Sequence, residues 1–211
     1  MSHFNHLVLD DFLPGELHDQ LLMYCLSEEA NFAPTGVYRH NEAVLDPYTR
    51  TSLYHTSGLG AFKEGFKQRI LDHFVVITEA LGVPAFPIAK TELELAAHND
   101  GSFFRPHIDT FSARDGTTGQ RDRVISLVYY FHSQPRIFEG GELAIFPLVP
   151  GTPLLLEPRD NRLVAFPSFA PHEVRRVSVP GKAFAHSRFA INCWLNRAKT
   201  ERKGSSFADT S

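Results

Sequence analysis

The chain has 211 residues, of which 43% are hydrophobic, enough to bury one sizeable core. Its formal charge of −3 gives no reason to expect binding to nucleic acid or to a membrane surface. The two cysteines stand far apart, which argues against a disulfide scaffold. No stretch approaches the roughly 18 consecutive apolar residues of a membrane helix. We therefore expect a soluble cytoplasmic protein, present as a monomer or a homodimer.

The first third of the chain is predicted to contain two amphipathic helices. Pro14 opens the first, in which apolar residues recur at helical spacing. The second is predicted over residues 58–81, with Gly82 as its stop. Its apolar stripe consists of Phe62, Phe66, Ile70, Phe74 and Ile77. We expect both helices to support a core formed by the rest of the chain.

From residue 89 onward the pattern changes to short strands, rich in aliphatic and aromatic residues and bounded by Gly, Pro, Asn or Asp. The predicted strands are 91–97, 123–131, 142–146, 154–157, 162–166 and 187–195. Such a series is typical of a sandwich or barrel, so a mainly β fold with flanking helices is predicted. We expect one domain over residues 1–198, with N-terminal helical support over 1–88 and a β core over 89–198. A flexible tail, 199–211, follows.

Two metal-binding residue types stand close together in the segment FRPHIDT, Phe104 to Thr110. In an extended chain, residues i and i+2 project from the same face, so His107 and Asp109 can point at one spot. A third ligand can come from His172, which stands at the start of a strand-like run, although a surface or capping role also suits that histidine. Two histidines and one carboxylate form the ligand set of non-haem Fe(II) oxygenases.

The predicted strand 187–195, SRFAINCWL, has two different faces. Alternation places Phe189, Ile191, Cys193 and Leu195 on an ordinary apolar face, and Arg188, Ala190, Asn192 and Trp194 on the other. A guanidinium on that second face is costly to bury unless a partner compensates its charge. Arginine is suited to bidentate binding of a carboxylate, which could belong to a dicarboxylate co-substrate or to an internal Glu.

Six motifs between residues 92 and 194 follow one another in a characteristic order. They are HID (107–109), RVISLVYYF (123–131), GGELAIFP (140–147), RLVAFPS (162–168), PHEV (171–174) and RFAINCW (188–194). This ordered set, which covers about half of the chain, resembles the Fe(II)- and 2-oxoglutarate-dependent dioxygenases of the prolyl 4-hydroxylase superfamily. The hypoxia-type and bacterial prolyl hydroxylase branch is the most similar. The resemblance implies a double-stranded β-helix, or jelly roll, as the core.

The same resemblance implies the cofactors and the residues that hold them. Fe(2+) would be bound by His107, Asp109 and His172, with 2-oxoglutarate and O2 as co-substrates and ascorbate as an accessory reductant. Arg188 and Tyr130 would hold the far carboxylate of 2-oxoglutarate. Sixteen residues separate His172 from Arg188, more than is usual in the family, which makes Lys182 an alternative cation. Arg188 is preferred because its strand matches the family through Trp194, whereas Lys182 follows a turn.

Further residues are candidates for the substrate pocket. They are Asn192, Trp194, Val128 and Arg114. Arg114 and Arg121 lie in the polar loop 110–122, which is long enough to cover an active site. Together with Arg123, which follows the loop, they could pair with acidic groups of a target. A second tyrosine of the most similar branch, ten residues before the metal histidine, is Ala97 here. His98, His132 and His186 are interpreted as solvent-facing or supporting histidines.

The function predicted from the resemblance is hydroxylation of an unactivated C–H bond, with release of succinate and CO2. A prolyl residue in a protein or peptide is the expected substrate, and a free amino acid or another small metabolite is the alternative. Two other classes of protein remain open at this point. A non-catalytic metal-binding jelly roll would have no use for an inward Arg188, and a zinc hydrolase would need a general acid or base beside the metal.

Overall fold

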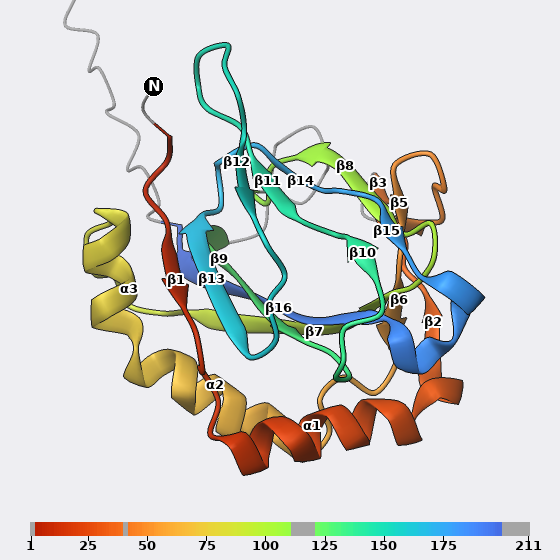
Figure 1. Cartoon of the computed structure of the whole chain (residues 1–211). Coiled ribbons are helices and arrows are strands. Elements are labelled where there is room, and N and C mark those ends of the chain that lie inside the picture. The colour runs from red at the N-terminus through yellow and green to blue at the C-terminus, as the bar shows by residue number, and fades with distance from the viewer. Residues whose placement is uncertain (1–2, 40–41, 111–120, 200–211) are drawn as a thin grey trace, which may run out of the picture.

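The computed structural model describes residues 3–39, 42–110 and 121–199. Its centre is a pair of facing antiparallel sheets, one of seven strands and one of five (Figure 1). The helices α1, α2 and α3 lie along the outer face of the larger sheet, and the smaller sheet faces its other side (Figure 1). The arrangement is the predicted jelly roll, and the mainly β fold with flanking helices is confirmed.

The seven-stranded sheet has the order β1-β13-β9-β16-β7-β6-β2, in which the longest strands lie at the centre. Its strands are β1 (Leu7–Leu9), β2 (Phe32–Pro34), β6 (Leu53–His55), β7 (Lys90–His98), β9 (Arg121–Phe131), β13 (Arg162–Pro167) and β16 (Arg188–Ala198). Strand β16 pairs with β7 on one side and with β9 on the other. A residue on β16 therefore has cross-strand neighbours from both halves of the sheet.

The five-stranded sheet has the order β12-β11-β14-β8-β5. Its strands are β5 (Arg50–Thr51), β8 (Phe103–His107), β11 (Leu143–Ile145), β12 (Leu154–Leu156) and β14 (His172–Val174). Two small ribbons complete the β structure: β3 (Val37–Arg39) with β4 (Glu42–Val44), and β10 (Glu139–Gly140) with β15 (Val177–Ser178). Most of these strands have two or three residues, too few to show an alternating pattern in the sequence.

The helices are α1 (Gly15–Ser27), α2 (Phe62–Asp72) and α3 (Phe74–Leu81), with short 3₁₀ turns at Glu29–Asn31, Pro180–Lys182 and Phe184–His186. The single helix predicted over 58–81 is wrong in two respects. Gly58 and Gly60 have φ angles of 68° and 51°, so the helix begins only at Phe62. At His73 the backbone leaves the helical region, and the imidazole Nδ1 binds the Arg69 carbonyl oxygen at 2.8 Å, which separates α2 from α3.

Two apolar clusters fill the space on either side of the large sheet. One lies between the sheet and the helices and includes Tyr129, Phe189, Ile191 and Cys193. The other lies between the two sheets and includes Tyr130 and Ala190. The two faces of the strand from Arg188 onward are therefore those that alternation predicts. Tyr129 and Tyr130, which are neighbours in β9, point to opposite sides of the sheet.

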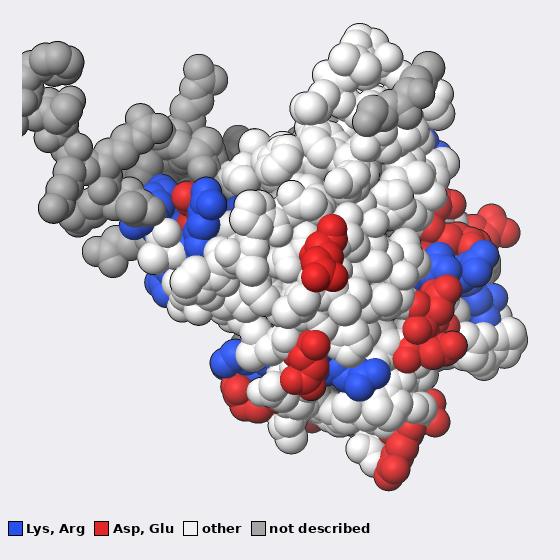
Figure 2. All heavy atoms as spheres, turned by 90° about the vertical axis from the view of Figure 1, so that its left-hand side faces the viewer, with Lys and Arg blue, Asp and Glu red and all other residues white. Residues whose placement is uncertain are grey.

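The surface carries charges of both signs. On the side of the molecule that lies to the left in Figure 1, basic and acidic side chains are interspersed around a largely uncharged centre (Figure 2). Exposed apolar side chains include Leu148 and Val149, with 78% and 60% exposure, in the connection between β11 and β12. Within the residues that the structure describes, no helix combines the length and the hydropathy that a membrane crossing needs.

Candidate metal centre and co-substrate pocket

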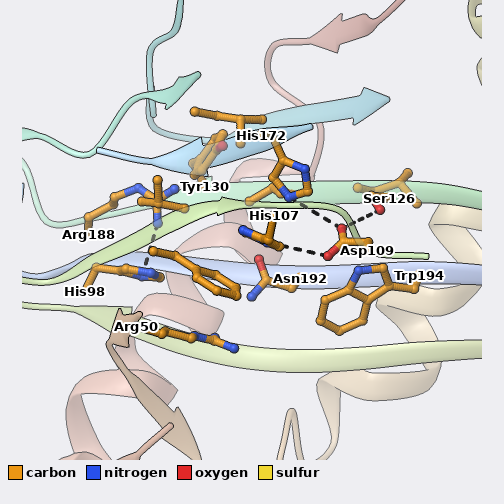
Figure 3. Close-up of a pocket in the computed structure, with 15 residues that line it drawn as sticks. Arg50, His98, His107, Asp109, Ser126, Tyr130, His172, Arg188, Asn192 and Trp194 are labelled. Atoms are coloured by element: carbon orange, nitrogen blue, oxygen red, sulfur yellow. Dashed lines mark hydrogen bonds and ion pairs between the residues drawn. The ribbon is translucent and has the colours of Figure 1, made fainter. Parts of the chain in front are cut away.

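Two neighbouring strands of the small sheet bring three candidate metal ligands together. His107 ends β8 and is the cross-strand partner of His172, the first residue of β14. Asp109 follows β8 by two residues, and its carboxylate oxygens lie 3.7 Å from His107 Nε2 and 3.6 Å from His172 Nε2 (Figure 3). One nitrogen or oxygen from each of the three residues lies within 4.8 Å of the others.

Hydrogen bonds to the backbone fix the tautomers of both histidines. His107 Nδ1 lies 2.7 Å from the Arg105 carbonyl oxygen, and His172 Nδ1 lies 2.9 Å from that of Ala170. A carbonyl oxygen only accepts, so each Nδ1 carries the proton and each Nε2 directs a lone pair toward Asp109. Burial, followed by the charge of His172, lowers the pKa of His107 to about 3, which keeps this ring neutral near pH 7.

Hydrogen bonds link the Asp109 carboxylate to two buried serines. Ser126 Oγ donates to Asp109 Oδ2 at 2.6 Å and lies 2.9 Å from Ser168 Oγ. Burial raises the pKa of Asp109, but the neighbouring histidines and the hydrogen bonds from Ser126 and Trp194 outweigh it and hold the pKa below its ordinary value. The result is an ionised carboxylate that faces the Nε2 atoms of His107 and His172. This donor set fits a divalent cation such as Fe(II).

A cavity between the two sheets adjoins these ligands. Its lining includes Val128, Tyr130, Arg188, Asn192 and Trp194, all of them predicted from the sequence. Its other lining residues are Arg50, His98, Phe104, His107, Asp109, Ser126, Leu127, Leu143, His172 and Val174.

Arg188 is the most unusual residue of this cavity. It is 1% exposed, and its guanidinium has no ionic partner among the described residues. Among the described residues no carboxylate forms an ion pair with it. Its Cζ lies 4.6 Å from the centre of the Tyr130 ring, and its Nη1 lies 3.1 Å from His98 Nδ1. The internal Glu partner considered from the sequence is therefore absent within the described part of the chain. Gly141, with a φ of 77°, leaves room for this side chain, since a Cβ there would lie 2.7 Å from Arg188 Cδ.

Two buried polar atoms at this end of the cavity lack a hydrogen-bond partner among the described residues. Arg188 Nε and the Tyr130 hydroxyl are inaccessible to water and make no hydrogen bond of normal geometry within the described residues. Buried polar groups are nearly always paired, so such atoms indicate a missing ligand. A donor pair of this kind fits one carboxylate of a dicarboxylic acid.

The alternative cation lies elsewhere. The Lys182 side chain is 76% exposed, and its Nζ lies 3.6 Å from Asp100 Oδ2, on the turn that follows β15. It does not line the cavity. Arg114 lies outside the described residues. Arg121, expected in the loop that includes Arg114, belongs instead to β9, which starts two residues earlier than predicted. Arg123 lies in this strand as predicted.

The Arg123 side chain contacts residues of the protein itself, so it is not available to pair with a target. Its Nη2 lies 2.8 Å from Glu92 Oε2, and its Cζ lies 4.0 Å from the centre of the Trp194 ring. The guanidinium therefore packs against the ring of the indole that lines the cavity.

The sequence analysis did not identify two residues of this candidate site, Arg50 and Glu94. Arg50 Nη2 donates to Glu94 Oε1 at 2.6 Å, and the same oxygen accepts from Asn192 Nδ2 at 3.0 Å. Arg50 also lies 4.9 Å from the centre of the Phe104 ring. Glu94 could have been found, because its carboxylate alternates with Leu93 and Leu95 in a predicted strand. Arg50 belongs to a two-residue strand with no recognisable pattern.

Comparison with known proteins agrees with this geometry. The family model of the 2OG-Fe(II) oxygenase superfamily matches residues 93–196. The chain is 26% identical over 197 residues to an uncharacterized PKHD-type hydroxylase of Synechocystis, covering 90% of this chain and 62% of that protein. The chain therefore spans less than two thirds of the length of this relative.

Two solved structures share the fold. A prolyl-4-hydroxylase of Pseudomonas putida has a TM-score of 0.66 at 22% identity, covering 94% of this chain and 95% of the other. A prolyl hydroxylase of Trichoplax adhaerens, solved with a peptide fragment of the hypoxia inducible factor oxygen degradation domain, has a TM-score of 0.66 at 20% identity, covering 90% and 83%. Residues 93–196 thus match the 2OG-Fe(II) oxygenase superfamily, and the chain has a prolyl 4-hydroxylase-like fold.

Proposed function

We propose that the protein is an Fe(II)- and 2-oxoglutarate-dependent oxygenase that hydroxylates a prolyl residue in a protein or peptide. One observation carries the proposal: a single cavity has three converging metal-binding groups at one end and, at the other, a buried guanidinium that forms no ion pair with a described carboxylate (Figure 3). A dicarboxylic 2-oxo acid has the complementary chemistry, since one end can bind a metal and the other can pair with Arg188. Residues 1–198 would form the one domain that does this.

The metal ligands would be His107 Nε2, His172 Nε2 and the Asp109 carboxylate. Bound there, Fe(II) supplies the activation of O2 that oxidises the 2-oxo acid and the substrate C–H bond. The overall reaction converts R–H, O2 and 2-oxoglutarate into R–OH, succinate and CO2. The protein's own contribution is to hold the reactants, because no carboxylate or imidazole beyond the three ligands is needed to move a proton.

The two ends of the cavity would position different groups, the far carboxylate of 2-oxoglutarate at one end and the metal ligand Asp109 at the other. Arg188 and Tyr130 would bind the far carboxylate of 2-oxoglutarate and so direct its 2-oxo acid end toward His107 and Asp109. Burial of both residues excludes the water that would otherwise compete for this carboxylate. The Ser126–Ser168 pair would keep the Asp109 carboxylate in one orientation.

The choice of a prolyl substrate is supported by one observation. The Trichoplax neighbour was solved with a peptide, and it shares this fold.

The test is to incubate the protein with Fe(II), 2-oxoglutarate and a protein extract of its own source cells. Mass spectrometry should then find peptides heavier by one oxygen atom at proline. The His172→Ala variant, treated identically, should leave these peptides unmodified. If no protein is modified while free proline or another amino acid is hydroxylated efficiently, the protein substrate is wrong and a small metabolite takes its place.

A further inference from the structure

The buried Arg188 guanidinium contacts another buried polar residue, His98. The two residues are cross-strand partners on β7 and β16, and His98 is 3% exposed. His98 Nδ1 lies 3.1 Å from Arg188 Nη1 (Figure 3). Both side chains line the same cavity. The contact is therefore part of the candidate co-substrate pocket and not of the apolar core.

The chemistry of this contact determines the state of the imidazole. A guanidinium has only donors, so Nδ1 of His98 must be the acceptor and Nε2 must carry the proton. Burial, followed by the positive charges of Arg188 and Arg50, holds the pKa of His98 well below its ordinary value. The ring is neutral near pH 7. It fixes the direction of one Arg188 nitrogen but leaves the charge of the guanidinium uncompensated.

Strand parity places His98, and not its neighbour Ala97, on the cavity side. Ala97 stands where the most similar branch has a tyrosine, ten residues before His107. In the structure Ala97 pairs with Phe189 and packs in the cluster beneath the helices, on the side away from the cavity. His98 takes the cavity side. Of the two interpretations that the sequence left open for His98, its burial excludes the solvent-facing one and agrees with the supporting one.

We propose that His98 is a positioning residue for co-substrate binding, which orients Arg188 through a neutral hydrogen bond and thereby keeps its full positive charge available to a carboxylate ligand. The proposal rests on the proposed function, in which that ligand is the far carboxylate of 2-oxoglutarate. A carboxylate in place of the imidazole would bind Arg188 more strongly, but it would also neutralise the charge that the ligand needs.

Two variants that have the same shape and differ in charge separate these effects. His98→Gln supplies a neutral acceptor, and His98→Glu supplies an anionic one. Binding of 2-oxoglutarate to the Mn(II)-loaded protein, measured by calorimetry without turnover, should weaken by less than about threefold in His98→Gln. It should weaken by about 100-fold in His98→Glu, because a charge-assisted pair with Arg188 then competes with the ligand.

The affinity for Mn(II) alone, measured by electron paramagnetic resonance, should be the same in both variants, since His98 is not among the metal ligands. A merely structural role predicts no difference between the two variants, with His98→Glu binding 2-oxoglutarate as tightly as His98→Gln; that result would overturn the inference. Failure of the wild-type protein itself to bind 2-oxoglutarate would instead refute the proposed function, and the two failures are therefore distinguishable.

Discussion

We expect that replacing His172 with alanine abolishes 2-oxoglutarate-dependent turnover and weakens Fe(II) binding by more than about 100-fold, since removing even an outer partner of a metal ligand costs about 10–100-fold. The side chain is 5% exposed and contributes one of the three converging lone pairs. The protein should stay folded, because the backbone pairs of β14 with β8 and β11 do not depend on the imidazole. Equilibrium dialysis against Fe(II) and oxygen consumption measure the two effects.

His107→Ala should behave in the same way, and His132→Ala is the matched control. His132 is also buried, with 4% exposure, but it lies outside the cavity. Its replacement should change neither Fe(II) binding nor turnover by more than about threefold, because it alters no metal ligand. Full activity in either ligand variant would refute the metal assignment.

The second large effect is expected at Arg188. In Arg188→Gln the KM for 2-oxoglutarate should rise by about tenfold to 100-fold, because a hydrogen bond to a charged group contributes about 1.5–3 kcal/mol. Fe(II) affinity should not change, since Arg188 is not among the ligands. Steady-state kinetics with varied 2-oxoglutarate give the KM directly.

Lys182→Gln is the control for this prediction, because Lys182 is the other cation that the sequence offers. Its side chain is exposed and paired with Asp100, so its removal should leave the KM within about twofold of wild type, as expected for an exposed ion pair. If the two variants behaved in the reverse manner, Lys182 would be the true partner of the co-substrate and the role proposed for Arg188 would be wrong.

The parts of the fold that could be predicted are those with long, regular patterns. Strand β16 alternates from Arg188 to Leu195, which is enough to separate the cavity face with Arg188 from the core face with Phe189. Helix α1 likewise follows from its apolar spacing. In the segment 58–81, however, the apolar stripe continues across the break at His73. Periodicity reports which side is buried and cannot register a local change in backbone direction.

The parts of the site that could not be predicted depend on contacts between distant segments. Arg50 reaches the cavity only because β5 pairs with β8, where Arg50 lies opposite Phe104. Nothing in the residues around Arg50 indicates that pairing. The place of His98 in the cavity was not predicted for a different reason. Counting along the chain from His107 gave Ala97, whereas its neighbour His98 occupies the side of the strand that faces the cavity. Alternation within the strand would have given the correct residue.

The most direct measurement is the formation of succinate from 2-oxoglutarate by the Fe(II)-loaded wild-type protein in air. We predict that succinate accumulates over many turnovers, that a proline-containing substrate peptide increases the rate, and that formation stops when O2 is removed. The His172→Ala protein should form none. Absence of succinate from a wild-type protein that binds Fe(II), with or without substrate, would contradict the assignment as an oxygenase and favour a metal-binding jelly roll without this activity.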